Sequence, residues 1–508
     1  MKFKHLAIFW FVLTFFLAAV SPGHPSEVAP RKPNLVILIA DQLRYQSLGY
    51  AGDQRAITPC IDRLAAEGMN FHNYVVSTPV CAASRATFMT GKYASSTGMV
   101  INELRLNPNQ DCLGHVLTAA GYETIYLGKW HLWANELGGH EKVANAFTPP
   151  GFYRLGFNDF WAAYNFGHDN YHAWYFRDTP KPHRIVGYGP DHFTDLAIEQ
   201  IRARGLSAKP FALVLSYGPP HDPWAAENVP RQWYEKFRGV DFPLPETWQD
   251  RPDSHMDRNA EPNRWLSYWK PRLPEFMRVY YAMTANLDWN VSRILNCLQR
   301  LGIENDTIVA FTSDHGEQFG AHGRVFKLTF YDESARVPLL IRWPGKIPAG
   351  HRSDACMASP DLMPTLLGLA GLRIPSQVEG MNLAAQAQGK PGPEPNFAFL
   401  QGMGHTCSWS DGFEWRALRN KQFTYAVYRS DGKELLFDNI ADPRQAKDLA
   451  QDASHQARLV ELRSKLNDKR AELQDTFEAC SWYNSHWTQD RNILRGAKGE
   501  FHRDPPQN

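Results

Sequence analysis

The sequence predicts an α/β protein with a large, mostly parallel sheet flanked by helices, followed by a smaller α+β subdomain. Continuous apolar runs indicate strands that are buried on both faces, which is typical of parallel sheets. Helical segments separate several of these runs, as expected for alternating strands and helices. Polar residues directly follow the runs, at the edge where such sheets bind ligands. The runs lie at 34–40 (NLVILIA), 124–127, 211–216 (FALVLS), 307–312 (TIVAFT) and 338–342.

The predicted elements bring polar side chains to one edge of the sheet. Helices at about 195–204 and 277–301 precede the third and fourth runs. In a parallel sheet the carboxyl ends of the strands share an edge, so the segments after the runs are expected to meet there. These segments are 41–42, 128–131, 218–222 and 313–317.

The C-terminal part has the pattern of a separate α+β subdomain. A stretch rich in Gly and Pro at 386–396 is typical of a linker. Beyond it, alternating segments predict antiparallel strands, with a hairpin turn at 430–432 and an amphipathic helix at 456–476. The expected strands are 415–418, 422–428 and 435–437. We therefore expect a catalytic domain over 32–384 and a C-terminal subdomain over 397–508.

The N-terminus has the features of an export signal. Lys2 and Lys4 precede an apolar run at 6–20, and small residues follow, which predicts a signal peptide over about residues 1–25. The run is shorter than the roughly 20 residues that span a bilayer, so a retained anchor is the weaker alternative. We expect an exported protein, periplasmic or extracellular, with no stable membrane anchor.

Charge and cysteine content limit the functional classes further. The 54 basic and 53 acidic residues give a formal net charge of +1, so no global field would recruit nucleic acid. Seven cysteines are an odd number. If one has a chemical role, six remain that could pair in an oxidising compartment, but the sequence does not give their connectivity.

A short motif around Cys81 carries the densest chemical pattern. Cys81 precedes a predicted helix, and Arg85, four residues on, would share its face. A helix N-terminus stabilises anions, which suits a catalytic site. Taken alone, a buried structural cysteine is the more common interpretation.

With its surroundings, the chain resembles the sulfatase family over about residues 32–372. The motif CAASR-ATFMTGKY occurs with the other family blocks in the expected order, although Ala83 replaces the commoner Pro. The resemblance implies an alkaline-phosphatase-like fold and an exported sulfuric-ester hydrolase. It also implies that a formylglycine-generating enzyme oxidises Cys81 to formylglycine (3-oxoalanine). The other blocks are PNLVILIADQ, TPCIDRLAAEGMNFHNYV, GYETIYLGKWHL, SYGPPHDP, TSDHGEQFGAHGRVFK, YDESARVPLLI and DLMPTLLGLAG.

The resemblance also assigns roles to individual residues. The hydrated aldehyde would attack sulfur through one hydroxyl and expel sulfate through the other. Carboxylate and amide ligands suit Ca²⁺ or Mg²⁺. Many relatives have Asp and Asn at positions 42 and 315, and the Gln and His found here admit Mn²⁺. The implied metal ligands are Asp41, Gln42, Cys81, Asp314 and His315. The implied catalytic residues are Cys81, Arg85, Lys129, His131, His221 and Lys327, with His221 protonating the departing oxygen.

The substrate class is a broader expectation. Export and aromatic insertions at 164–191 and 241–270 favour a sulfated carbohydrate, or else a sulfated small molecule. A phosphonate monoester or phosphodiester hydrolase of the same superfamily is the first alternative, since such relatives share Gln and His at positions 42 and 315. A non-catalytic binding protein with an unmodified Cys81 is the second. Residues that could contact substrate or simply pack are Trp130, Trp133, Trp224, Trp409, His322 and His405.

Overall fold

The computed structural model describes residues 32–134, 142–255 and 264–494. The expected export signal at 1–25 lies outside these ranges, as do part of the insertion at 241–270 and the last residues of the C-terminal subdomain. Within the described ranges, no helix combines the length and apolar character that a membrane span requires. None of the seven cysteines forms a disulfide.

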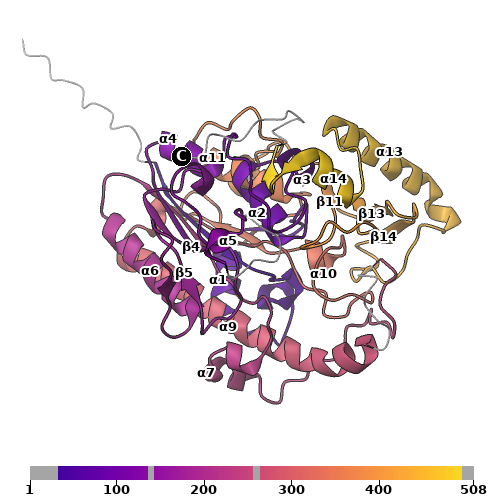
Figure 1. The fold of residues 1–508 in the computed structure, drawn as a ribbon, viewed down its shortest axis with the longest axis horizontal. Helices are drawn as coiled ribbons and strands as arrows, with labels where there is room; N and C mark the ends of the chain where they lie inside the picture. Colours follow the sequence, from indigo (N-terminus) through magenta and orange to yellow (C-terminus); the bar gives the residue numbers. More distant parts are fainter. Residues whose placement is uncertain (1–31, 135–141, 256–263, 495–508) are drawn as a thin grey trace, which may run out of the picture. The chain divides into compact units, whose positions relative to one another are not determined.

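A mixed, mostly parallel sheet of eight strands forms the centre of the main body (Figure 1). The strand order is β10-β2-β9-β8-β1-β7-β3-β4, and the five strands from β8 to β4 are parallel. β9 runs antiparallel to both its neighbours. This confirms the predicted fold class. The strands are β1 Asn34–Ala40, β2 Met69–Phe71, β3 Glu123–Lys129, β4 Phe160–Tyr164, β7 Phe211–Ser216, β8 Thr307–Ser313, β9 Leu339–Arg342 and β10 His351–Ser353.

Helices cover both faces of this sheet, which explains its unbroken apolar strands. Alternate residues of β1 enter two different hydrophobic cores, with Leu35, Ile37 and Ile39 in one and Val36 and Leu38 in the other. Both faces are therefore shielded from water. Helices α2 Cys81–Thr90, α4 Leu113–Ala119 and α11 Leu362–Leu369 pack on the first face. Helices α1 Pro59–Glu67, α6 Gly189–Arg204 and α9 Lys270–Arg300 pack on the second.

The C-terminal subdomain is an antiparallel meander covered by one helix. β11 Ala398–Gly402 was not predicted, whereas β12 Trp415–Arg419, β13 Phe423–Tyr428 and β14 Glu434–Asp438 match the expected strands closely. Helix α13, Gln456–Glu472, covers one face through Leu459, Leu462 and Leu466 and ends four residues before the expected boundary.

The other face of the meander packs against the loop that follows β8. Phe330 and Tyr331 of this loop share a core with strands β11 to β14. The Trp415 indole Nε1 donates to the carbonyl of Leu328 at 2.8 Å, and Arg324 donates to the Tyr428 hydroxyl at 2.9 Å. The C-terminal sheet therefore holds the segment that contains Lys327.

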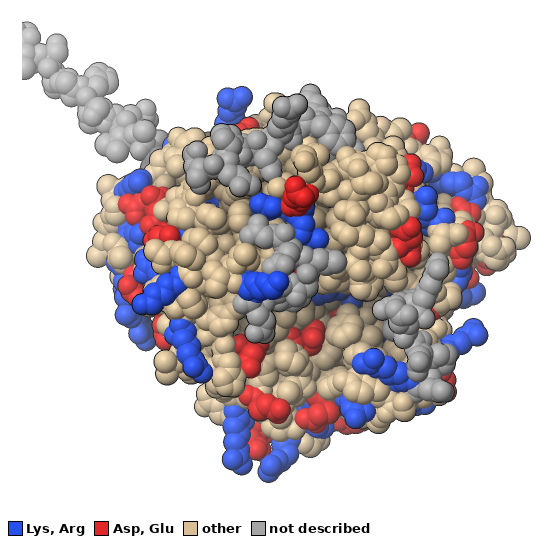
Figure 2. All heavy atoms as spheres, in the orientation of Figure 1, with Lys and Arg blue, Asp and Glu red and all other residues tan. Residues whose placement is uncertain are grey.

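Short elements complete the described chain. Charged side chains of both signs are interspersed on the face shown in Figure 2, in keeping with the small net charge. Apart from short 3-10 turns, the remaining helices of the described chain are α3 Ala94–Thr97, α5 Val143–Ala146, α7 Arg231–Tyr234, α10 Asp332–Ala335, α12 Ala384–Ala387, α14 Cys480–Trp487 and a π-helix at Trp265–Trp269. The remaining strands are β5 Trp174–Tyr175, β6 His183–Arg184, β15 Thr488–Gln489 and β16 Asn492–Ile493.

Candidate active site

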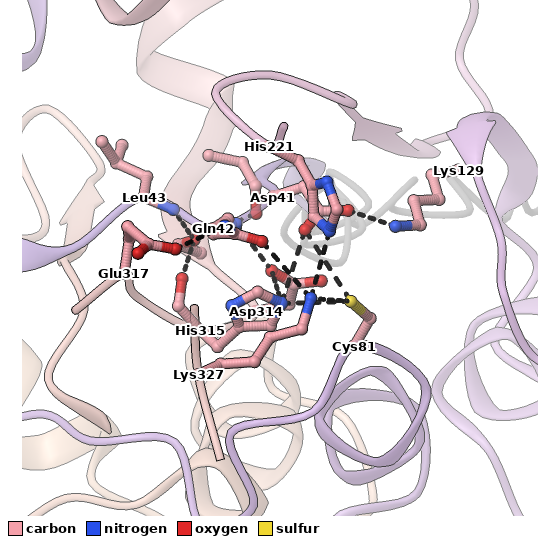
Figure 3. A network of polar contacts seen from close by, with 12 residues as sticks. Asp41, Gln42, Leu43, Cys81, Lys129, His221, Asp314, His315, Glu317 and Lys327 are labelled. Atoms are coloured by element: carbon pink, nitrogen blue, oxygen red, sulfur yellow. Dashed lines mark hydrogen bonds and ion pairs between the residues drawn. The ribbon is translucent and has the colours of Figure 1, made fainter. Parts of the chain in front are cut away.

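Two adjacent strands deliver two buried carboxylates to the carboxyl edge of the sheet. β1 and β8 are parallel and pair Ala40 with Ser313, so the next residues, Asp41 and Asp314, lie side by side (Figure 3). The Asp314 amide donates to the carbonyl of Ala40 at 3.2 Å, and this bond continues the ladder beyond the strand ends. Both carboxylates are fully buried.

Cys81 lies at the start of α2 and faces these carboxylates. Its Sγ is 3.0 Å from His315 Nε2, 3.1 Å from Lys327 Nζ and 3.9 Å from Asp41 Oδ1. Burial would raise the pKa of the Cys81 thiol, but Lys129 and Lys327 bring it below its ordinary value. An anionic or electron-rich group at this position is therefore stabilised by its surroundings.

Arg85 and Lys129 neutralise the two carboxylates. The Arg85 guanidinium lies 2.8 Å from Asp314 Oδ2 and 3.3 Å from Asp41 Oδ2, and Lys129 Nζ lies 2.5 Å from the latter atom. Arg85 also donates to the Lys129 carbonyl and the Ser216 hydroxyl. Burial would raise the pKa of Asp41, but Lys129, His221 and Arg85 hold it well below its usual range. Both carboxylates are thus paired, as burial of charge requires.

Gln42 presents its side-chain oxygen to the centre of the site. Its Nε2 donates to Glu317 at 2.6 Å, while its Oε1 accepts from Lys327 Nζ at 3.3 Å. Glu317 is fixed by the amides of Phe319 and Phe326, and burial raises its pKa to about 7. Glu317 therefore sets which end of the Gln42 amide faces inward.

The backbone around the site is strained at several non-glycine residues. Gln42, His131, Phe326 and Leu328 have φ between 60° and 79°, a region that disfavours residues with a Cβ. The surroundings hold these conformations in place. The Tyr280 hydroxyl donates to the Gln42 carbonyl at 2.8 Å, for example. Strain of this kind clusters at functional sites.

The donor set fits a divalent cation. Ligand atoms of Asp41, Cys81, Asp314 and His315 all lie within 4.8 Å of one another and are buried. His315 Nδ1 donates to the Gly316 carbonyl at 3.0 Å, which leaves its Nε2 lone pair facing the carboxylates. Two carboxylates, one amide oxygen and one imidazole could hold such an ion.

Two buried histidines flank the cluster. His221 Nδ1 donates to the Asp222 carbonyl at 2.8 Å, and its Nε2 lies 3.1 Å from Lys327 Nζ. Neither ring nitrogen of His131 has a hydrogen-bond partner among the described residues. Burial, with His168 and Lys327, lowers the pKa of His221 well below its ordinary value, and burial, with Lys129 and Arg85, does the same for His131. A buried imidazole without partners is available to a ligand.

The cluster opens into a cavity of about 520 Å³. Cys81, His131, His221 and Lys327 line it, so four of the six predicted catalytic residues face this space, while Arg85 and Lys129 are buried and contact the carboxylates. Part of its wall comes from the two aromatic insertions, which were singled out only as ranges. Wall residues that sequence analysis did not name include Asn102, Phe166, His168, Arg264, Trp269 and Phe413.

Of the residues that sequence analysis offered as possible substrate contacts, some line the cavity and others are packed in the protein interior. His405 lines the cavity, whereas His322 stacks on Tyr331 at 3.8 Å and pairs with Glu333. Trp130, Trp133 and Trp224 belong to the hydrophobic cores, and Trp409 packs against one of them. Packing therefore accounts for these four tryptophans, and the wall aromatics come from other positions.

Comparison with known proteins agrees with this geometry. The sulfatase family model matches residues 33–372, and the model for the C-terminal region of N-sulphoglucosamine sulphohydrolase matches 320–472. The chain is 36% identical over 460 residues to an ulvan-active sulfatase of Formosa agariphila, covering 89% of this chain and 84% of that protein. It is 26% identical to an N-acetylglucosamine-6-O-sulfatase of Bacteroides thetaiotaomicron, covering 90% of each.

A solved structure extends the match to three dimensions. The crystal structure of a putative sulfatase from Bacteroides fragilis superposes with a TM-score of 0.76 at 29% identity, covering 91% of this chain and 99% of that one. Sequence, fold and family model thus agree over most of the chain, which belongs to the sulfatase family of sulfuric-ester hydrolases.

Proposed function

We propose that the chain is an exported hydrolase that releases sulfate from a sulfated carbohydrate, with residue 81 oxidised to formylglycine. The observation that carries this proposal is the position of Cys81, in contact with both His315 and Lys327 at the base of the cavity. The carbohydrate is supported by relatives named for ulvan and for N-acetylglucosamine 6-O-sulfate chemistry.

Asp41, Gln42, Asp314, His315 and the oxidised residue 81 would hold a divalent cation, Ca²⁺ or else Mg²⁺ or Mn²⁺. When bound, the cation would lower the pKa of the attacking hydroxyl and polarise the ester as a Lewis acid. With it, positive charge exceeds negative charge at the base of the cavity. A sulfate ester, which is anionic, is the complementary ligand.

The residues of the chain then divide the remaining work. Arg85 and Lys129 fix Asp41 and lie where positive charge would stabilise the sulfate oxygens. Lys327 Nζ lies 3.1 Å from both Cys81 Sγ and His221 Nε2. One ammonium group therefore contacts both the proposed nucleophile and the proposed proton donor. His131 would orient the nucleophile through its ring nitrogens, for which the described residues offer no other hydrogen-bond partner.

His221 would donate the proton to the departing oxygen. Its lowered pKa means that the ring is neutral near pH 7 before substrate arrives. An anionic ester beside the ring raises its affinity for a proton, so substrate binding favours the protonated form that donates.

Maturation and domain organisation form part of the same proposal. A formylglycine-generating enzyme would act on Cys81 before α2 packs, because the folded residue is only 1% exposed. The export signal over about 1–25, the catalytic domain over 32–384 and the C-terminal subdomain over 397–508 complete the proposed organisation.

A mass measurement tests the proposal directly. Trypsin releases residues 64–85 as one peptide, which contains Cys81 as its only cysteine. Loss of sulfur and gain of an aldehyde in this peptide, from exported active protein, is the expected result. An intact thiol in fully active enzyme would contradict it.

A phosphonate monoester or phosphodiester hydrolase is the second candidate, favoured by Gln42 and His315 at the cation site. Hydrolysis of 4-nitrophenyl sulfate and bis(4-nitrophenyl) phosphate by one preparation separates the two. We expect the larger kcat/KM for the sulfate ester. A larger value for the phosphodiester would favour the second candidate.

A further inference from the structure

One segment between β4 and β5 places two aromatic rings against the two histidines of the site. The Phe166 ring meets the His131 imidazole edge-on, with centroids 5.0 Å apart and an angle of 81°. The His168 imidazole lies flat on His221, with centroids 3.9 Å apart and an angle of 7°. Two rings, two residues apart, therefore contact both imidazoles.

Asn228 ties this segment to the loop that contains His221. Its Nδ2 donates to the His168 carbonyl and to the Pro223 carbonyl, each at 3.1 Å. Its Oδ1 accepts from the Asn170 amide at 2.8 Å. The Asn228 side chain is buried, so these bonds are shielded from water. The two imidazoles are thus held in contact through their backbones as well as through their rings.

The hydrogen bonds of His221 do not by themselves fix the direction of its Nε2. Nδ1 is held by the Asp222 carbonyl at 2.8 Å, and Nε2 lies 3.1 Å from Nζ of Lys327, whose long side chain can move with the ring, so the ring can still tilt. A flat neighbour on one face removes this freedom. A proton donor has to be held within a fraction of an ångström of its working geometry, so this restraint matters for catalysis.

We propose that His168 is a positioning residue whose ring face holds His221 Nε2 toward the departing ester oxygen, with Asn228 fixing the pair. The inference rests on the proposed role of His221 as proton donor. It makes a distinctive prediction. A weakly basic leaving oxygen departs without a proton, whereas a strongly basic one needs the donor in place.

The test compares two aryl sulfates that differ in the basicity of the leaving oxygen, in wild-type protein and in H168A and H168F. For H168A we expect kcat/KM to fall on the order of 10²-fold with phenyl sulfate and less than about 5-fold with 4-nitrophenyl sulfate. Phenylalanine keeps a flat ring against His221, so H168F should retain both values within about 5-fold of wild type. The ratio of kcat/KM for phenyl sulfate to kcat/KM for 4-nitrophenyl sulfate does not depend on the fraction of protein that is folded.

A matched control comes from the same insertion. His183 is exposed on β6, and H183A should leave both rates unchanged. If H168A lowers kcat/KM equally for both substrates, the inference is overturned, because a general structural defect affects both reactions alike. Losses in H168F as large as those in H168A would overturn it too, since they would assign the effect to the imidazole nitrogens.

The proposed function and this inference fail in different ways. Wild-type protein that hydrolyses neither aryl nor carbohydrate sulfate would overturn the function, and the role of His168 with it. Active wild type with an unselective H168A would overturn only the positioning role.

Discussion

Two buried arginine–carboxylate clusters of the chain differ in that one is enclosed by protein and the other borders a cavity. Arg416 and Asp475 of the C-terminal subdomain form a closed group, in which Gln401, Tyr483 and the Gly402 carbonyl satisfy the remaining polar atoms. Arg85 is as deeply buried, but the groups around its carboxylates line a cavity.

The two arginines are equally buried, and the clusters differ in whether neighbouring polar groups remain available to a ligand. Near Arg85, the ring nitrogens of His131 have no hydrogen-bond partner in the described part of the chain, and Cys81 and Lys327 face the cavity. The Arg416 cluster leaves no comparable opening within the described residues. A buried ion pair alone is therefore weak evidence of function, whereas one beside unpaired groups and a cavity indicates a site.

The largest expected effect that separates the two clusters comes from Cys81. C81A should lower kcat by on the order of 10⁴-fold or more, since it removes the nucleophile. Its thermal unfolding should remain cooperative. Cys60, a buried thiol in α1 that is not part of the cavity lining, gives the matched control, and C60A should keep its turnover. Wild-type-like rates in C81A, measured with 4-nitrophenyl sulfate, would contradict the assignment.

Metal removal is expected to have the next largest effect. Chelation should lower kcat/KM at least about 100-fold, because the carboxylates near Arg85 are proposed to share a cation. It should also lower the unfolding temperature, since a ligand that binds only the folded state stabilises it. Re-addition of Ca²⁺, Mg²⁺ or Mn²⁺ in separate samples should restore activity and identify the preferred ion. Full activity in excess chelator would be inconsistent with the cation site.

Exchanging the two arginines for methionine compares the clusters directly. R416M leaves Asp475 buried without its partner, which should cost about 3–5 kcal/mol of unfolding free energy while the folded enzyme keeps its kcat. R85M also leaves a buried carboxylate, Asp314, without its arginine, but it should in addition lower kcat by about 10²–10³-fold, because positive charge beside the nucleophile is lost. Urea unfolding and steady-state kinetics on both variants provide the measurements. A lowered kcat in folded R416M together with an unchanged kcat in R85M would show that the catalytic role has been given to the wrong cluster.

Acid sensitivity gives the smallest expected effect. Burial would raise the pKa of Asp475, but Arg416 holds it below its ordinary value. The unfolded chain therefore binds more protons, and the stabilisation is present above about pH 4 and lost as pH falls through the folded pKa. D475N should lose stability less steeply with acid than wild type, by at most about 1.4 kcal/mol per pH unit. Asp111 is exposed, and D111N should follow the wild-type slope in urea unfolding at pH 2.5–5.

The main strands and the catalytic cluster could be predicted for separate reasons. A strand covered on both faces must be apolar throughout, so β1, β7 and β8 stand out in the sequence. Adjacent parallel strands then force Asp41 and Asp314 together. The roles at Cys81 and Lys327 came from the family motifs, since neither spacing nor periodicity specifies them.

Other features depend on contacts that a sequence does not display. β2 and β10 contain three residues each, too few to show a period. The direction of the segment around His168 depends on Asn228, sixty positions away, so only the insertion as a whole could be singled out. The residues that form the wall of the cavity therefore could not be predicted from the sequence alone.

The bond from Trp415 to the Leu328 carbonyl has a consequence for biosynthesis. A ribosome makes the cation-binding strands before the meander that supports the Lys327 segment. A nascent chain that stops short of β12 would have every proposed ligand but would lack Trp415 and its bond to the Leu328 carbonyl. Turnover should accordingly begin only after translation has passed the meander, so a chain that is not yet that long would be inactive.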